Sequence, residues 1–69
     1  MVDVNRLRGI IAEHGMSQRK VAKELGITDK TFYTKMKTGV FDSAEMSAMI
    51  SMLDIKNPAA IFFAETVSQ

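Results

Sequence analysis

Apolar residues recur along the chain at spacings of three and four, as they do on helices that bury one face. Together with the flanking polar residues, this spacing predicts five short helices, at about 3–14, 17–25, 28–38, 42–53 and 58–65. No segment alternates apolar and polar residues as a strand would. The pattern therefore predicts an all-α fold, a compact bundle of five short helices. The predicted core comprises Leu7, Ile10, Ile11, Val21, Ala22, Leu25, Phe32, Met36, Met46, Met49, Ile50, Leu53, Ile61 and Phe62.

A polar residue that can act as a cap stands at the start of each of the first four helices. The side chains of Asp3, Ser17, Thr28 and Asp42 can accept hydrogen bonds from the free N–H groups of the first helical turn. Glu45 follows Asp42 by three residues and completes a capping box. Each cap is also flanked by two apolar residues that can pack together as a hydrophobic staple. These pairs are Val2 and Leu7, Met16 and Val21, Ile27 and Phe32, and Phe41 and Met46.

Only Gly26 and Ile27 separate the second predicted helix from the cap of the third. A glycine can reverse the chain in a left-handed conformation without a Cβ clash, and Ile27 can then enter the core between the two helices. Ala22 is small enough for the third helix to cross the second closely. These features predict two short helices joined at a steep angle, as in a helix-turn-helix.

Residues 17–32, which read S-Q-x-x-V-A-x-x-L-G-I-T-x-x-T-F, resemble the helix-turn-helix of the lambda-repressor-like family. This family includes phage repressors and their Cro-type antagonists. The following FYTKMKTGVFDSAEM and the terminal IFFAETV more narrowly resemble small Cro-like regulators of phages of Gram-positive bacteria. The resemblance implies that the third helix, about 28–38, is a recognition helix that enters the DNA major groove, while the second helix spans the backbone.

Positive charge is concentrated in the same segment. The net charge of the chain is only +1, yet residues 17–39 hold six of its nine basic residues and only two acidic ones. If Phe32 and Met36 face inward, a stripe at i, i+3, i+4 and i+7 faces outward on the third helix. It consists of Lys30, Tyr33, Thr34 and Lys37. Because DNA carries a phosphate charge about every 1.7 Å of its axis, such a surface favours DNA binding.

The resemblance implies base contacts for Asp29, Lys30 and Thr34. Lys30 can donate to guanine, Asp29 can accept from cytosine, and Thr34 can touch a thymine methyl group. For Asp29, the alternative to a base contact is an ion pair with Lys30 or Arg19, since its carboxylate repels phosphates. Gln18 matches the family's glutamine that binds a phosphate and braces the recognition helix. The residues expected to contact the DNA backbone are Ser17, Gln18, Arg19, Thr28, Tyr33 and Lys37.

The composition gives no support to an enzyme or a metal site. The chain has no cysteine and one histidine, His14, which is expected near the C-terminal end of the first helix. Catalysis by a nucleophile or by acid and base needs partner groups, and we find no second histidine and no converging pair of carboxylates. Three ligands for a metal ion cannot be assembled either. We therefore expect no enzymatic activity, no cofactor and no metal.

A single domain over residues 1–69 is expected for a chain of this size. No apolar run approaches the roughly 20 residues that cross a bilayer, and the first residues lack the apolar stretch of a signal peptide. These features predict no membrane contact and a cytoplasmic location, which the phage resemblance makes the cytoplasm of a bacterial host cell.

The C-terminal apolar helix, predicted over 58–67, has apolar groups on more than one face. Either this tail wraps back over the first helix, or it exposes an apolar patch meant for another chain. In the second case the candidate partner interface consists of Phe62, Phe63 and Val67.

Two functions remain open on this reading. The first is a DNA-binding transcriptional regulator of Cro or repressor type, a homodimer on double-stranded operator DNA in a phage lysis–lysogeny switch. The second is a protein-binding modulator, an antirepressor or co-repressor that docks on a phage repressor protein and alters its operator binding. The near-zero net charge, Asp29 on the groove-facing side and the apolar tail favour the second function.

Overall fold

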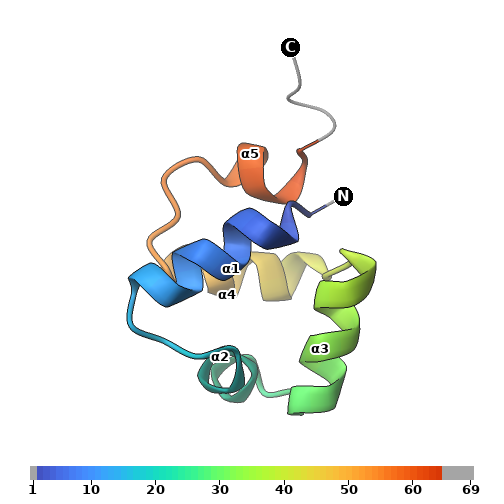
Figure 1. The fold of residues 1–69 in the computed structure, drawn as a ribbon. Coiled ribbons are helices and arrows are strands. Elements are labelled where there is room, and N and C mark those ends of the chain that lie inside the picture. The colour runs from blue at the N-terminus through green and yellow to red at the C-terminus, as the bar shows by residue number, and fades with distance from the viewer. Residues whose placement is uncertain (1, 65–69) are drawn as a thin grey trace.

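The computed structural model describes residues 2–64, and every regular element in that range is a helix. The helices are α1 (Val4–Glu13), α2 (Gln18–Leu25), α3 (Asp29–Thr38), α4 (Ser43–Met52) and α5 (Pro58–Phe62). α2 packs against α1, α3 and α4, and α1 also packs against α5. α3 stands at a steep angle to α1 and α4, and α5 lies at the opposite end of the molecule from the turn between α2 and α3 (Figure 1). The predicted all-α bundle of five short helices is confirmed.

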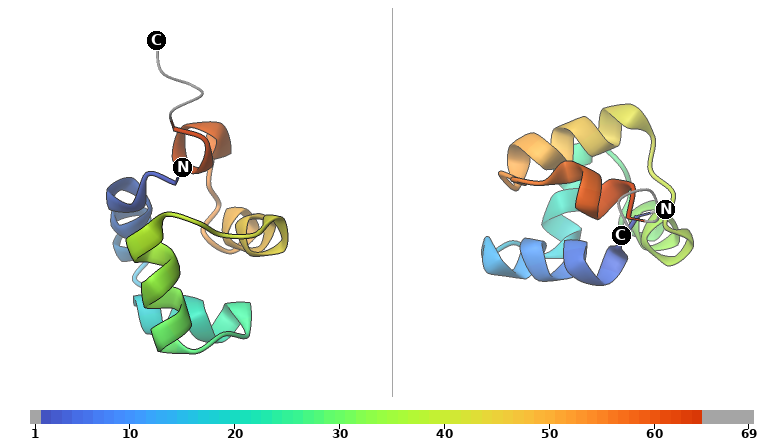
Figure 2. Two further views of the ribbon diagram at one scale, coloured as in Figure 1. Left: turned by 90° about the vertical axis from the view of Figure 1, so that its right-hand side faces the viewer. Right: turned by 90° about the horizontal axis from the view of Figure 1, so that it is seen from above.

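The core lies where all five helices meet. α5 lies on one side of α1 and α4, and α2 lies on the other (Figure 2). Every predicted core residue is either buried or packed against the buried cluster. The structure adds Val2, Phe41 and Ile55 to the buried set. Fully burying one such aliphatic or aromatic side chain contributes about 1.5–3 kcal/mol, so this cluster is the main stabilising feature of the fold.

Side-chain caps begin the first four helices, as predicted. The side chains of Asp3, Ser17, Thr28 and Asp42 accept the backbone N–H three residues later, at 3.1, 3.0, 3.1 and 2.7 Å. Glu45 returns the contact in α4, because its Oε1 accepts the N–H of Asp42 at 2.9 Å. Each cap satisfies an N–H group that has no partner within its own helix, which fixes where that helix starts.

Left-handed residues end the first four helices. Gly15, Gly26 and Gly39 follow α1, α2 and α3 with φ angles of +67°, +77° and +73°. Asp54 takes the same role after α4 with φ +50°, although it is not a glycine. The N–H of Ile55 then donates back into the end of α4, to the carbonyl oxygen of Ile50 at 3.0 Å. Aspartate is one of the few residues with a side chain that tolerates this conformation.

Two backbone hydrogen bonds hold the N-terminal segment between distant parts of the chain. The N–H of Val2 donates to the carbonyl oxygen of Gly39 at 3.2 Å, at the corner between α3 and α4. The N–H of Asp3 donates to the carbonyl oxygen of Ile61 in α5 at 2.7 Å. The start of α1 is therefore joined to both the end of α3 and the last helix.

The last helix is shorter than the predicted 58–65 or 58–67. α5 ends at Phe62, and Phe63 leaves the helical conformation with φ −131°. The φ and ψ angles of Phe63, −131° and 49°, lie outside the helical region, so the helix cannot continue through this residue. At the same end of α5, the carbonyl oxygen of Ile61 accepts the N–H of Asp3.

The candidate partner interface is also revised. Phe62 is only 2% exposed and belongs to the core, so its side chain is not available to another chain. Phe63 is 51% exposed and remains a surface residue, and Val67 lies outside the described residues. Between residues 2 and 64, no helix combines the length and the apolar character needed to cross a bilayer.

Candidate nucleic-acid interface

The turn between α2 and α3 fixes how the two helices meet. The N–H of Ile27 donates to the carbonyl oxygen of Ala22 at 3.1 Å, and the left-handed Gly26 makes this reversal. Ala22 is fully buried, and Ile27 packs against the core cluster. The left-handed glycine and the inward isoleucine, both predicted, are confirmed.

The two faces of α3 differ in exposure. Phe32 and Met36 are buried, and the ring of Phe32 lies against that of Phe41 with centroids 5.8 Å apart. The opposite face, called the α3 stripe below, is exposed along its whole length. It consists of Lys30, Tyr33, Thr34 and Lys37. The core therefore holds one side of α3 and leaves the other side open to a partner, as the spacing predicts.

The cationic groups of this region divide into paired and unpaired ones. Among residues 2–64, no carboxylate lies within ion-pair distance of Lys23, Lys30 or Lys37. Lys20 pairs with Glu24 at 3.5 Å on the surface of α2. Unpaired ammonium groups are the ones that can neutralise phosphates without first losing a partner.

An ion pair joins the start of α2 to the start of α3. The Nε atom of Arg19 lies 3.3 Å from Oδ2 of Asp29, and both side chains are largely exposed. The ion pair considered for Asp29 is thus confirmed with Arg19 as the partner. Because the contact uses Nε, the two terminal NH₂ groups of the guanidinium keep donors that an anion can accept. Exposed pairs of this kind are weak, so a phosphate can compete for them.

The hydroxyl groups among the predicted contact residues belong to Ser17, Thr28, Tyr33 and Thr34. The hydroxyl of Thr28 donates to that of Thr31 at 2.9 Å, and the hydroxyl of Thr34 donates to the carbonyl oxygen of Lys30 at 3.1 Å. Ser17 uses its oxygen as the cap of α2, which leaves its proton free to donate. Thr34 can therefore offer its methyl group to a base, whereas Ser17 can donate to a phosphate.

Gln18 is half-buried and lines a shallow hollow of about 210 Å³ between the two helices. The other residues of this hollow are Arg19, Asp29, Phe32 and Tyr33. Gln18 of α2 and the exposed Tyr33 of α3 thus line the same hollow. All nine residues predicted to contact DNA lie on α2, on α3 or at their caps.

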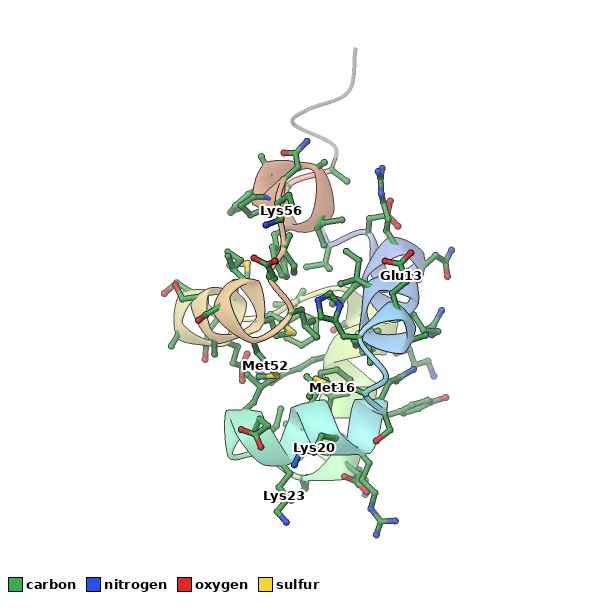
Figure 3. The ribbon with its side chains drawn as sticks, turned by 90° about the vertical axis from the view of Figure 1, so that its left-hand side faces the viewer. Glu13, Met16, Lys20, Lys23, Met52 and Lys56 are labelled. Carbon is green, nitrogen blue, oxygen red and sulfur yellow. The ribbon has the colours of Figure 1, made fainter. Side chains whose placement is uncertain are left out.

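A larger hollow of about 590 Å³ lies on another side of the molecule, between α1 and the segment that joins α4 to α5. Figure 3 looks toward this side, with Glu13 and Lys56 lying on opposite sides of it. Its apolar lining includes Ile10, Leu53 and Ile61, and the Nδ1 atom of His14 lies 3.0 Å from the carbonyl oxygen of Ile10. In the described part of the chain, no three His, Cys, Asp or Glu side chains are grouped to hold a metal ion.

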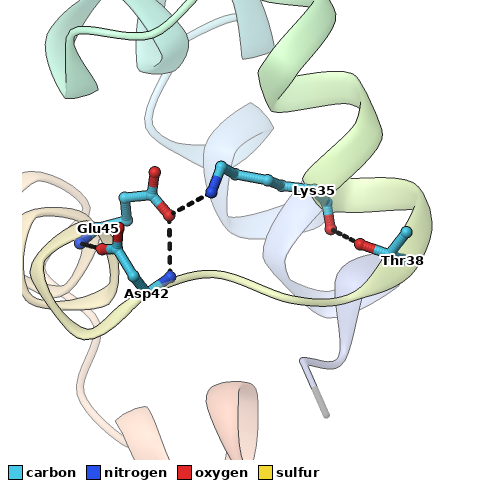
Figure 4. Close-up of polar contacts among 4 residues, drawn as sticks. All are labelled: Lys35, Thr38, Asp42 and Glu45. Atoms are coloured by element: carbon cyan, nitrogen blue, oxygen red, sulfur yellow. Dashed lines mark hydrogen bonds and ion pairs between the residues drawn. The ribbon is translucent and has the colours of Figure 1, made fainter.

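One polar contact was not anticipated from the sequence. The Nζ atom of Lys35 lies 3.1 Å from Oε1 of Glu45, so α3 and α4 are joined by an ion pair (Figure 4). In the sequence, Lys35 is only one of the six basic residues of 17–39. The available signal was the capping box, because it places the carboxylate of Glu45 close to the link between the two helices.

Comparison with known proteins does not identify a relative. No protein-family model matches the chain, and neither a curated protein sequence nor a solved structure matches it significantly.

Proposed function

We propose that this chain is a DNA-binding transcriptional regulator of the Cro or repressor type, with α3 as its recognition helix. The observation that carries the proposal is the division of α3 into a buried face, with Phe32 and Met36, and the exposed α3 stripe. A helix that follows a tight turn and offers one complete polar face is the element that helix-turn-helix proteins place in the major groove.

Each exposed group has a stated role in the proposed complex. Lys30 donates to guanine O6 and N7, and the methyl group of Thr34 touches a thymine. Asp29 uses Oδ2 to hold Arg19, which aims the guanidinium at a phosphate, and can use its other oxygen to accept from cytosine. Backbone contacts come from Ser17, Gln18, Arg19, Thr28, Tyr33 and Lys37, which fix the register without reading sequence.

A homodimer is part of the proposal. Two copies on a two-fold operator place their recognition helices in major grooves about 34 Å apart. One copy, with few unpaired cations, binds weakly, and joining two copies raises the affinity by making the second contact intramolecular. The half-exposed Phe63 is a candidate contact between the copies. The regulation is steric, because an occupied operator excludes polymerase or a competing repressor, as in a phage lysis–lysogeny switch.

The test is DNA binding by the purified protein without any partner. Preferred sites are selected from a randomised duplex pool, and binding to a selected site is compared with binding to a mixed-sequence duplex. Lys30→Ala is expected to weaken binding to the selected site more than binding to the mixed-sequence duplex. Lys56→Ala is the matched control, because Lys56 lies outside α2 and α3 and pairs with Asp54 at 3.0 Å. Failure of the wild-type protein to select any site refutes the proposal.

A protein-binding modulator that docks on a phage repressor is the second candidate. The observation that favours it is the hollow of about 590 Å³, whose lining combines apolar residues with charges of both signs. A modulator of this kind gives no shift of operator DNA alone and changes the shift only when the repressor is present. One gel-shift experiment, with operator DNA in the absence and presence of the repressor, therefore distinguishes the two proposals.

A further inference from the structure

The Lys35–Glu45 ion pair is the least exposed one in the described part of the chain. The two side chains are 27% and 10% exposed, whereas the members of the three other pairs are 48–85% exposed. Partly buried charges are screened less by water and salt than exposed ones. Lys35 therefore differs from the other basic residues of α2 and α3, although it belongs to the same stretch of sequence.

Glu45 connects this pair to the start of α4. Its Oε1 atom lies 3.1 Å from Nζ of Lys35 and also accepts the N–H of Asp42 at 2.9 Å (Figure 4). Asp42 in turn accepts the N–H of Glu45 at 2.7 Å through Oδ1. The lysine ammonium is thus bound to an oxygen that is already held by the capping box, so its position is defined by the first turn of α4.

The backbone of Lys35 ends α3. Its carbonyl oxygen accepts the N–H groups of Gly39 at 2.8 Å and Val40 at 3.2 Å. Next to it, Met36 is buried in the core. Lys35 therefore contacts the last turn of α3, the corner after it and the start of α4. This end of α3 is the one joined to α4.

We propose that Lys35 is a positioning residue that sets the orientation of α3 through Glu45, and that it does not contact DNA phosphates. The inference rests on the proposed function, since it concerns how the α3 stripe is presented to base pairs. Thr34 directly precedes Lys35 and Lys30 lies more than one turn earlier on the same helix, so a tilt or rotation of α3 displaces both of them. Recognition by paired hydrogen bonds tolerates displacements of only about 0.5 Å or 10–20°.

The competing interpretation is that Lys35 neutralises a phosphate like an ordinary basic residue. For that, its ammonium has to leave Glu45, and a carboxylate that is only 10% exposed would lose its charged partner. Breaking one side of a buried or half-buried pair is unfavourable because the remaining charge stays poorly solvated. The two interpretations predict different responses to salt.

The salt dependence of binding to a mixed-sequence duplex gives the first readout. The logarithm of the binding constant is measured against the logarithm of NaCl concentration between about 50 and 200 mM. Lys37→Met, the matched control on the exposed stripe, is expected to reduce the slope by about 0.9, the contribution of one phosphate contact. Lys35→Met is expected to leave the slope at the wild-type value.

Sequence discrimination gives the second readout, as the ratio of affinity for a selected site to affinity for the mixed-sequence duplex. Lys35→Met and Glu45→Gln are each expected to lower this ratio about tenfold, and the double variant is expected to lower it no further. Lys35→Arg restores it, and Lys56→Met, outside α2 and α3, leaves it unchanged. A general loss of folded protein cancels in the ratio, because both affinities fall together.

Two outcomes overturn the inference while the proposed function stands. One is a salt slope for Lys35→Met that falls as it does for Lys37→Met, and the other is a discrimination ratio that remains at the wild-type value. If the wild-type protein binds neither duplex, the proposed function itself fails and the inference falls with it. The wild-type measurement thus separates the two kinds of failure.

Discussion

Replacing Gly26 with alanine tests the turn on which the α2–α3 arrangement depends. A Cβ atom added at this position meets no heavy atom within 4 Å, so the substitution creates no clash. The backbone, however, is left-handed, with φ +77° and ψ +25°. For an L-residue other than glycine this conformation costs about 1–2 kcal/mol. We therefore expect Gly26→Ala to lower the free energy of unfolding by about 1–2 kcal/mol through the backbone alone.

Gly9 supplies a matched control for the same substitution. It lies inside α1, an added Cβ again meets no heavy atom within 4 Å, and its φ angle is not positive. Alanine is favoured over glycine in a helix by about 1 kcal/mol, so Gly9→Ala is expected to stabilise the protein. The same glycine-to-alanine change, in equally open surroundings, is thus predicted to lower the free energy of unfolding at Gly26 and to raise it at Gly9.

The measurement is urea and thermal unfolding of both variants, followed by far-ultraviolet circular dichroism. For a domain of this size, 1 kcal/mol corresponds to a shift of about 4–8 °C in Tm. Gly26→Asn is expected to recover part of the loss, because asparagine tolerates the left-handed conformation better than alanine. A Gly26→Ala protein as stable as wild type would refute the reasoning, since it would mean that the turn has another conformation.

The other predictions concern the proposed interface, the surface phenylalanine and one helix cap. Lys30→Ala is expected to cost about 1–3 kcal/mol of discrimination at one base-pair position, measured by competition with single-base variants of a selected site. An equal loss for all sequences would assign Lys30 to a phosphate instead. Phe63→Ser is expected to shift the sedimentation equilibrium toward the monomer with little change in thermal stability, and an unchanged mass in both proteins would exclude Phe63 from the dimer contact. Ser17→Ala removes the oxygen that caps α2 and is expected to lower the free energy of unfolding by about 1 kcal/mol; a variant as stable as wild type would mean that the cap hydrogen bond adds nothing.

The features that sequence reasoning predicted well are governed by neighbours along the chain. A cap such as Asp3 or Thr28 bonds to an N–H only three residues away, and a helix end such as Gly26 depends on its own φ angle. The exposed stripe of α3 follows in the same way from the spacing of Phe32 and Met36. Local rules suffice for these features because every partner lies within about two helical turns.

The features that were missed depend on contacts between distant segments. The bond from Asp3 to Ile61 joins the first segment to the last helix, and no pattern within 58–65 contains it. The Lys35–Glu45 pair depends on the path of the link between α3 and α4, so a count of basic residues could not distinguish this paired lysine from the unpaired ones. At the candidate site, exposure was predictable, whereas the pairing of each charge needed the three-dimensional arrangement.

The hydrogen bonds of Val2 and Asp3 bear on the order in which the molecule folds. Their acceptors, Gly39 and Ile61, lie far along the chain. The turn between α2 and α3 involves only near neighbours, whereas the contact between the first and last helices joins distant segments. Contacts that join distant segments form slowly because a long loop must close first. We therefore expect the hydrogen bonds that join the start of α1 to Gly39 and Ile61 to form later in folding than the turn between α2 and α3.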